Sequence, residues 1–154
     1  MSLAVLKSRA QYGADAPPVS IEVLLAGGLP NFAIVGMPEK AVRESKDRVR
    51  GAILSSKFDF PQSRIIVSLA PADMPKAGGR YDLAIALGIL AASGQIPADP
   101  FEDTEIYGEL ALDGSIRGVP GILPAALQAA CAGHRMLVPA VNRTEVALNP
   151  IELL

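Results

Sequence analysis

A glycine-rich turn is the part of this sequence best suited to chemistry. The stretch "PADMPKAGGRYDLAIALGILAASG" (Pro71 to Gly94) places Gly78 and Gly79 before a long uncharged run. Glycines before a helix can let backbone amides hold a phosphate, and similar turns position the nucleophile of some hydrolases. The turn could therefore be a phosphate loop, a catalytic turn or a bend that serves packing.

Three charged residues accompany these glycines. Lys76 and Arg80 could hold a phosphate together with the helix N-terminus, which makes both candidate nucleic-acid contacts. Asp82 is placed to cap the helix and would compete for the same donors. In the alternative interpretation, Arg80 pairs with an acidic residue of its own domain or of a neighbouring subunit.

Nucleotide-binding motifs are missing from the sequence. A Walker A loop needs a Gly-Lys pair, and the sequence contains none. Gly114, Gly118 and Gly121 do not have the spacing of a dinucleotide fingerprint. We therefore expect no cofactor in this chain.

Metal and nucleophile chemistry is also poorly supported. The chain has one histidine and one cysteine, whereas zinc takes three or four such ligands. We expect Cys131 to be a small buried residue and His134 to have a local role. A Ser-Lys dyad stays possible, with Ser115 or Ser93 near Lys76 as the candidates.

Composition and charge suggest the setting of these residues. Half of the 154 residues are hydrophobic and tryptophan is absent, so the core must be aliphatic. One cysteine fits a reducing cytoplasm, and no apolar run is long enough to span a membrane. Residues 1–80 carry a net charge of +4 and residues 81–154 a net charge of -6. Such asymmetry fits a nucleic-acid face, charged faces that meet between subunits, or charged faces that are simply solvated.

A helix is predicted over residues 37–56, with Pro38 in its first turn. Lys40, Arg43 and Arg50 share its outer stripe and are the remaining nucleic-acid candidates. The same stripe contains Asp47, and acid–base pairs spaced by four run along the helix, so a solvated face is the alternative. Its apolar face is predicted to consist of Val42, Ser45, Val49, Ala52 and Ile53.

Strand and helix patterns surround this helix and the glycine turn. Asp113-Gly114 predicts a hairpin, and Gly133 ends a second apolar helix. The order β-β-β-α-β-α-β-β-α-β predicts a mixed sheet covered by helices, an α+β fold. The expected strands are residues 3–10, Val19–Ala26, Phe32–Gly36, Arg64–Pro71, two strands between 106 and 119, and His134–Pro139. The later helices are expected to start at Asp82, at residue 121 and near residue 140, the last with Asn142 as its cap.

Two long stretches resemble one known family. "VGMPEKAVRESKDRVR" and "APADMPKAGGRYDLAIALGILAASG", continued by "YGELALDGSIRGVPGILPAALQAA", resemble the N-terminal domain of the ComM/YifB family of Mg-chelatase-like AAA+ proteins. The resemblance covers nearly the whole chain. It implies a ribosomal protein S5 domain 2-like fold, similar to the proteolytic domain of Lon, and a single domain over residues 1–154.

The same resemblance implies partners and a setting. An AAA+ module that binds ATP and Mg would follow this domain and is absent from the chain. The resemblance implies that members of this family act in the cytoplasm as hexameric helicases, which engage single-stranded or branched DNA during natural transformation. The expected role is therefore assembly of a ring and guidance of DNA, or assembly alone without DNA contact.

The resemblance to Lon also concerns catalysis. Lon places its nucleophilic serine after a Pro-Lys-x-Gly-Pro run and its catalytic lysine at the start of the next helix. In "PKAGGR" the serine position is held by Arg80, and in "PGIL" the lysine position is held by Leu123. A guanidinium cannot act as nucleophile and leucine cannot act as base. The resemblance therefore implies a domain without peptidase activity.

Overall fold

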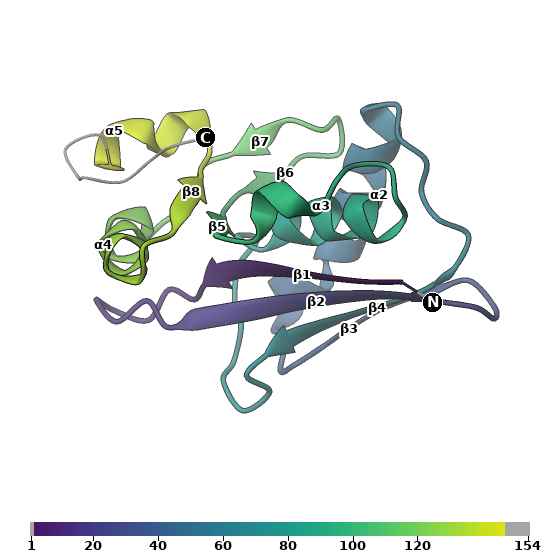
Figure 1. Ribbon diagram of the computed structural model, residues 1–154, viewed down its shortest axis with the longest axis horizontal. Coiled ribbons are helices and arrows are strands. Elements are labelled where there is room, and N and C mark those ends of the chain that lie inside the picture. Colours follow the sequence, from purple (N-terminus) through teal and green to yellow (C-terminus); the bar gives the residue numbers. More distant parts are fainter. Residues whose placement is uncertain (1, 147–154) are drawn as a thin grey trace.

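The computed structural model describes residues 2–146, which form a mixed sheet with helices packed against it (Figure 1). The six strands have the order β3-β4-β2-β1-β5-β8. They comprise β1 (Ser2–Arg9), β2 (Pro18–Ala26), β3 (Asn31–Val35), β4 (Arg64–Ala70), β5 (Thr104–Ile106) and β8 (Arg135–Leu137). The observed class is the predicted one, mixed α/β and consistent with the S5-like, Lon-like fold.

Both pairing directions occur in this sheet. β2 is antiparallel to β1 and β4, whereas β3 is parallel to β4, and β5 is parallel to both β1 and β8. The central strand β2 alternates buried and half-buried residues from Val19 to Ala26. Such alternation is typical of a sheet with one covered face.

Helices pack against both faces of the sheet, with the smaller group at the β5–β8 end. They comprise α1 (Lys40–Arg43), α2 (Ser45–Ser55), α3 (Asp82–Ala92), α4 (Ile122–Ala132) and α5 (Arg143–Val146), with short 3-10 turns at Asp99–Phe101 and Ala140–Asn142. Figure 1 shows α2 and α3 above β1 and β2, with α4 and α5 at the other end of the molecule.

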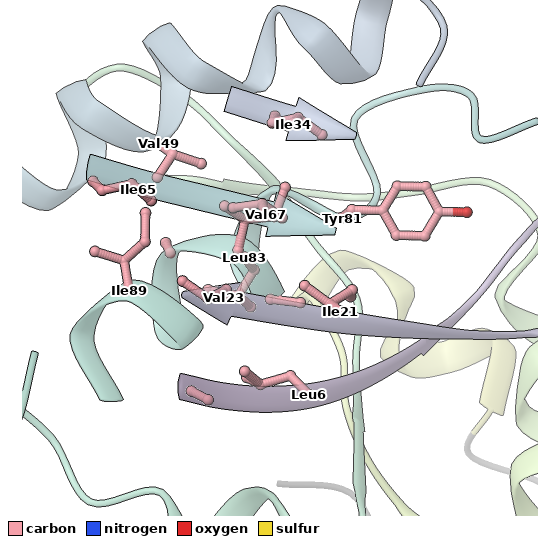
Figure 2. Packing of buried hydrophobic residues seen from close by; sticks show 14 of the residues in the cluster. Leu6, Ile21, Val23, Ile34, Val49, Ile65, Val67, Tyr81, Leu83 and Ile89 are labelled. Atoms are coloured by element: carbon pink, nitrogen blue, oxygen red, sulfur yellow. The ribbon is translucent and has the colours of Figure 1, made fainter. Parts of the chain in front are cut away.

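The main core lies between the sheet and α3. Figure 2 shows Leu6, Ile21 and Val23 of the sheet beside Ile89 of α3. A Cβ at Gly88 would come within 2.6 Å of the Val23 side chain, so a residue without a side chain lets α3 approach β2 this closely. The prediction that this helix is buried nearly all round is confirmed.

A second, smaller core lies under α4. It consists of alanines and larger apolar residues, namely Ala16, Tyr107, Val119, Ile122, Ala125, Ala126, Ala129 and Met136. Cys131 of α4 is exposed, so the prediction that it is buried is wrong. The helix turns its alanines inward, which leaves Cys131 on its outer side.

The helix predicted over residues 37–56 is two helices. α1 and α2 are joined at Glu44, and Pro38 forms a bridge with Lys76 instead of beginning a helix. Arg48 Nη2 donates to the Ala41 carbonyl at 2.8 Å, an acceptor that a continuous helix would use for the Ser45 amide. This competition accounts for the interruption.

The two strands predicted between residues 106 and 119 are present, and a third strand that was not predicted precedes them. β6 (Glu109–Leu110) and β7 (Ile116–Arg117) form the predicted hairpin, with Gly114 at φ +92° in its turn. The preceding residues form β5, which joins the main sheet. The helix predicted near residue 140 begins as α5, and its last residues lie outside the described part of the chain.

Candidate functional site

Lys76 lies inside the protein, at the end of the sheet. Its side chain is 0% exposed, and Nζ donates to the carbonyl of Gly36 at 2.8 Å and to the carbonyl of Pro71. Burial lowers the pKa of its ammonium group. Lys76 therefore ties the turn to the ends of β3 and β4, and its amine is not on the surface where a DNA contact would need it.

The two glycines of the turn have different roles. Gly78 has φ +79° and faces open space, so it supplies a left-handed backbone conformation. A Cβ at Gly79 would overlap the carboxyl group of Glu109. The group that approaches this backbone is therefore a side chain of the same chain, supplied by the β6–β7 hairpin.

Arg80 is also buried, at 3% exposure. Its Nη1 donates to the Pro120 carbonyl at 2.9 Å, and its guanidinium carbon lies 5.5 Å from the centre of the Tyr107 ring. Burial lowers the pKa of this guanidinium. The predicted pairing of Arg80 with an acid of its own domain is not found among residues 2–146.

Asp82 does not cap α3, because its carboxylate forms no capping hydrogen bond to the helix. It accepts from Arg48 Nε at 2.6 Å, from the Leu110 amide at 3.1 Å and from the hydroxyl of Ser45. The hydrogen bond to Asp82 raises the pKa of Arg48. The cap prediction is thus corrected. This buried carboxylate connects α3 to α2 and to the hairpin by accepting hydrogen bonds from both, so it does not compete for donors at the start of α3.

The two positions compared with the Lon dyad come near each other. Pro120, whose carbonyl accepts from Arg80, lies two residues before the start of α4, and Leu123 lies in the first turn of that helix with 41% of its surface exposed.

The alternative Ser-Lys dyad has no geometric support in the described residues. Ser93 donates to the Leu90 carbonyl and accepts from Gln95, while Ser115 lies exposed in the hairpin turn. Both hydrogen bonds recorded for the Lys76 amine go to main-chain carbonyls.

The other nucleic-acid candidates are exposed on two consecutive helices. Lys40 and Arg43 lie on α1, and Arg50 lies on α2 with its guanidinium 4.3 Å from the centre of the Phe60 ring. A cleft of about 350 Å³ next to Arg50 is also lined by Lys46 and Asn31. We call α1 and α2 with exposed Lys40, Arg43 and Arg50 the basic helix pair.

Acidic residues lie among these cations. Glu44 forms the predicted pair with Arg48, at 3.9 Å, and Glu39 and Asp47 are exposed. The basic helix pair is therefore a mixed surface, with cations that can reach an anionic partner and acids that limit how strongly they attract it.

A buried carboxylate that the sequence patterns did not single out lies at Glu105. Arg9 holds it from Nε at 2.9 Å, the Tyr107 hydroxyl donates to it at 2.7 Å, and His134 Nδ1 lies 2.8 Å from it. The predicted local role of His134 is thus a contact with β5. In the sequence, Glu105 stands between Thr104 and Ile106 and close to the acids of positions 102 and 103, so no pattern marks it as buried.

Metal binding has no candidate site in residues 2–146, where no group of three or more His, Cys, Asp or Glu side chains is gathered as metal ligands would be. Within the same residues, no helix has the length and apolar character needed to cross a bilayer.

The fold and this turn define a class of protein. The chain is a mixed α/β domain of the S5-like, Lon-like type, with a buried arginine at the turn before α3. Residues 21–142 match the family described as subunit ChlI of Mg-chelatase, and the chain belongs to this family.

Individual relatives give the same result. The chain is 51% identical to the protein YifB of Salmonella typhimurium and 50% identical to the competence protein ComM of Haemophilus influenzae, each over 148 residues. A protein of Mycobacterium tuberculosis is 41% identical over 149 residues. These matches cover 96% of this chain, which spans about 30% of the length of those relatives and corresponds to their N-terminal part.

Proposed function

We propose that this chain is a non-catalytic N-terminal domain of a ComM-like ATPase that helps to assemble a hexameric ring and to engage DNA. The observation that carries the proposal is the basic helix pair, whose exposed Lys40, Arg43 and Arg50 can reach a phosphate backbone. The 50% identity to a competence protein supports DNA as the anionic partner. ATP and Mg would bind to another part of a longer protein. We propose that this protein is cytoplasmic.

The proposal that this domain is not a peptidase rests on residue chemistry. Arg80 and Leu123 supply neither a nucleophile nor a base at the positions compared with Lon. The buried amine of Lys76 binds main-chain carbonyls, which also keeps it from activating a serine. A serine-reactive fluorophosphonate probe should therefore leave the protein unlabelled, and stoichiometric labelling would contradict this part of the proposal.

Lys76 and Arg80 are left out of the proposed DNA contact because both are buried. The test uses the triple charge reversal Lys40→Glu, Arg43→Glu and Arg50→Glu. Affinity for single-stranded and branched DNA is measured at two salt concentrations. We expect weaker binding and a slope of log K against log salt that is shallower by about 2 to 3, since each lost phosphate contact removes about 0.9.

A matched control comes from the opposite end of the molecule. Arg143 is an exposed cation on α5, which Figure 1 places far from α2. Arg143→Glu should change binding little, apart from a general effect of net charge. A loss in Arg143→Glu of about a third of that in the triple variant, in proportion to the change in net charge, would show a non-specific charge effect and would contradict a contact by the basic helix pair.

The second candidate is an assembly module without DNA contact, and the acids within the basic helix pair favour it. Sedimentation in the DNA-binding buffer separates the two. If the triple variant binds DNA like the wild type but loses its self-association, the assembly role stands alone.

A further inference from the structure

Two arginines, Arg9 and Arg48, each hold a carboxylate in the same way. Arg9 donates from Nε and Nη2 to the two oxygens of Glu105, at 2.9 and 3.1 Å. Arg48 donates from Nε and Nη2 to the two oxygens of Asp82, at 2.6 and 3.1 Å. This two-donor edge of the guanidinium matches the spacing of two oxygens on one carboxylate or phosphate.

Arg80 presents the same edge without an acceptor. Its Nε and Nη2 are buried and have no hydrogen-bond partner within residues 2–146, although Nη1 is bound to Pro120. At 3% exposure it lies deeper than Arg9, at 7%. A buried cation with unsatisfied donors is costly, and an anion that accepts from both nitrogens would remove that cost.

We infer that the Nε and Nη2 edge of Arg80 is a binding site for an oxyanion, either a carboxylate or a phosphate. The Tyr107 ring, 5.5 Å from the guanidinium carbon, lies beneath the cation. The Pro120 carbonyl fixes the remaining terminal nitrogen, so the free edge is held in place before the anion arrives. This inference does not depend on the proposed DNA contact of the basic helix pair.

Because Arg80 is only 3% exposed, an anion can reach this edge only if neighbouring residues of the chain move. Residues 118–121 link β7 to α4 and place the Pro120 carbonyl against Arg80. Pro120 itself is exposed, and Gly121 has φ +73°, a conformation that glycine adopts without strain. We expect this segment to move aside as the anion enters and to return once the anion is bound, with the Pro120 carbonyl again on Nη1.

The test observes the Arg80 side chain directly. In ¹⁵N-labelled protein, the Nε–H resonance of Arg80 is followed by NMR while sodium phosphate or sodium acetate replaces chloride at constant ionic strength. We expect a saturable shift with a dissociation constant of about 1 mM or tighter. The Nε–H resonances of Arg9 and Arg48, whose edges are already occupied, should not move.

The two titrations distinguish the source of the oxyanion. Saturation with phosphate alone indicates a phosphate ligand, saturation with acetate alone indicates a carboxylate, and saturation with both indicates that either fits. Unsaturated, linear drift with both anions would overturn the inference, and this readout needs no variant.

Arg80→Lys supplies the matched variant, because lysine keeps the charge but lacks the two-donor edge. The Gly108 amide, which donates to the Arg80 carbonyl at 3.2 Å, reports on the site in both proteins. Its saturable shift should be lost in Arg80→Lys and kept in Arg50→Lys, an exposed control. A response that survives Arg80→Lys would place the anion elsewhere.

Discussion

The carboxylate of Asp82 binds Arg48 through both oxygens, with 2.6 Å between Oδ2 and Nε, and thereby joins the first residue of α3 to α2. Asp82 is 0% exposed, and it also accepts from Ser45 and from the Leu110 amide. One side chain therefore fixes two helices and the β6–β7 hairpin beside the glycine turn.

Asp82→Asn should lower the free energy of unfolding by about 2 to 4 kcal/mol. An amide offers one acceptor oxygen in place of two and leaves Arg48 without its counter-charge, although the 20% exposure of that arginine allows some solvation. Urea unfolding at neutral pH measures the change. Glu44→Gln is the control, because its 3.9 Å pair with the same arginine is exposed and should contribute less than about 0.5 kcal/mol. Similar losses in both variants would contradict the importance of the Asp82 contact.

The main elements of this fold could be predicted from local patterns. Alternation in Val19–Ala26, the apolar run after Asp82 and the Asp113-Gly114 turn each correspond to an observed element. These features depend on neighbouring residues, which a sequence displays directly. The short β5 was missed because its three residues are all buried and show no alternation.

The candidate site could be predicted only in part. The sequence suggests that Lys76 and Arg80 are surface cations. In the structure each has an acceptor 40 residues away in the sequence, the carbonyl of Gly36 for Lys76 and that of Pro120 for Arg80, in addition to the nearby Pro71 carbonyl for Lys76. Every residue has a main-chain carbonyl, so the residue types in a sequence do not indicate which carbonyl will accept a hydrogen bond. The prediction of Asp82 as a cap failed because its partner Arg48 lies 34 residues away in the sequence, where local spacing does not reveal it.

Tyr81→Phe should leave stability at neutral pH unchanged or raise it by about 1 kcal/mol. The Tyr81 hydroxyl is buried with no hydrogen-bond partner within residues 2–146, so its removal costs no bond. Tyr12→Phe is the control, because Tyr12 is 66% exposed and should change stability little. A loss of more than about 1 kcal/mol in Tyr81→Phe would mean that the hydroxyl has a partner.

The same tyrosine predicts an alkaline dependence. Burial raises the pKa of Tyr81 from 10.0 to about 12. Between these values the unfolded chain loses the proton while the folded chain keeps it, so the free energy of unfolding falls as pH rises, by about 1.4 kcal/mol per pH unit. Urea unfolding between pH 9 and 12 should show a smaller fall in Tyr81→Phe than in wild type. Part of the fall should remain, because the pKa of buried Tyr107 is also raised.

Gly36→Ala should destabilise the protein far more than Gly78→Ala, although both glycines have positive φ, +107° and +79°. A Cβ at Gly36 would overlap the Leu69 carbonyl, whereas a Cβ at Gly78 faces open space. We expect a cost of about 3 kcal/mol or more for Gly36→Ala, from backbone strain and overlap together. Gly78→Ala should cost about 1 kcal/mol, a lowering of the melting temperature by about 3 °C. Equal melting temperatures in the two variants would rule out the close approach at Gly36.

Glu105→Gln should destabilise the protein by about 3 to 5 kcal/mol. The Glu105 carboxylate is the shared acceptor of Arg9 and the Tyr107 hydroxyl, and His134 lies beside it, so β1, β5 and the residues flanking them are joined there. Glutamine keeps the shape but offers one acceptor oxygen, which leaves the buried guanidinium of Arg9 without a counter-charge. Unfolding in urea, followed by far-UV circular dichroism, measures this change.

Two further variants separate the carboxylate from its surroundings. Glu102→Gln removes an exposed acid three residues earlier and should change stability by less than about 0.5 kcal/mol. Tyr107→Phe should cost about 1 kcal/mol, and the double variant with Glu105→Gln should cost less than the two single changes added, because both act on one hydrogen bond. Strict additivity would show that the Tyr107 hydroxyl and Glu105 contribute independently, and a small effect of Glu105→Gln alone would mean that Arg9 finds another acceptor.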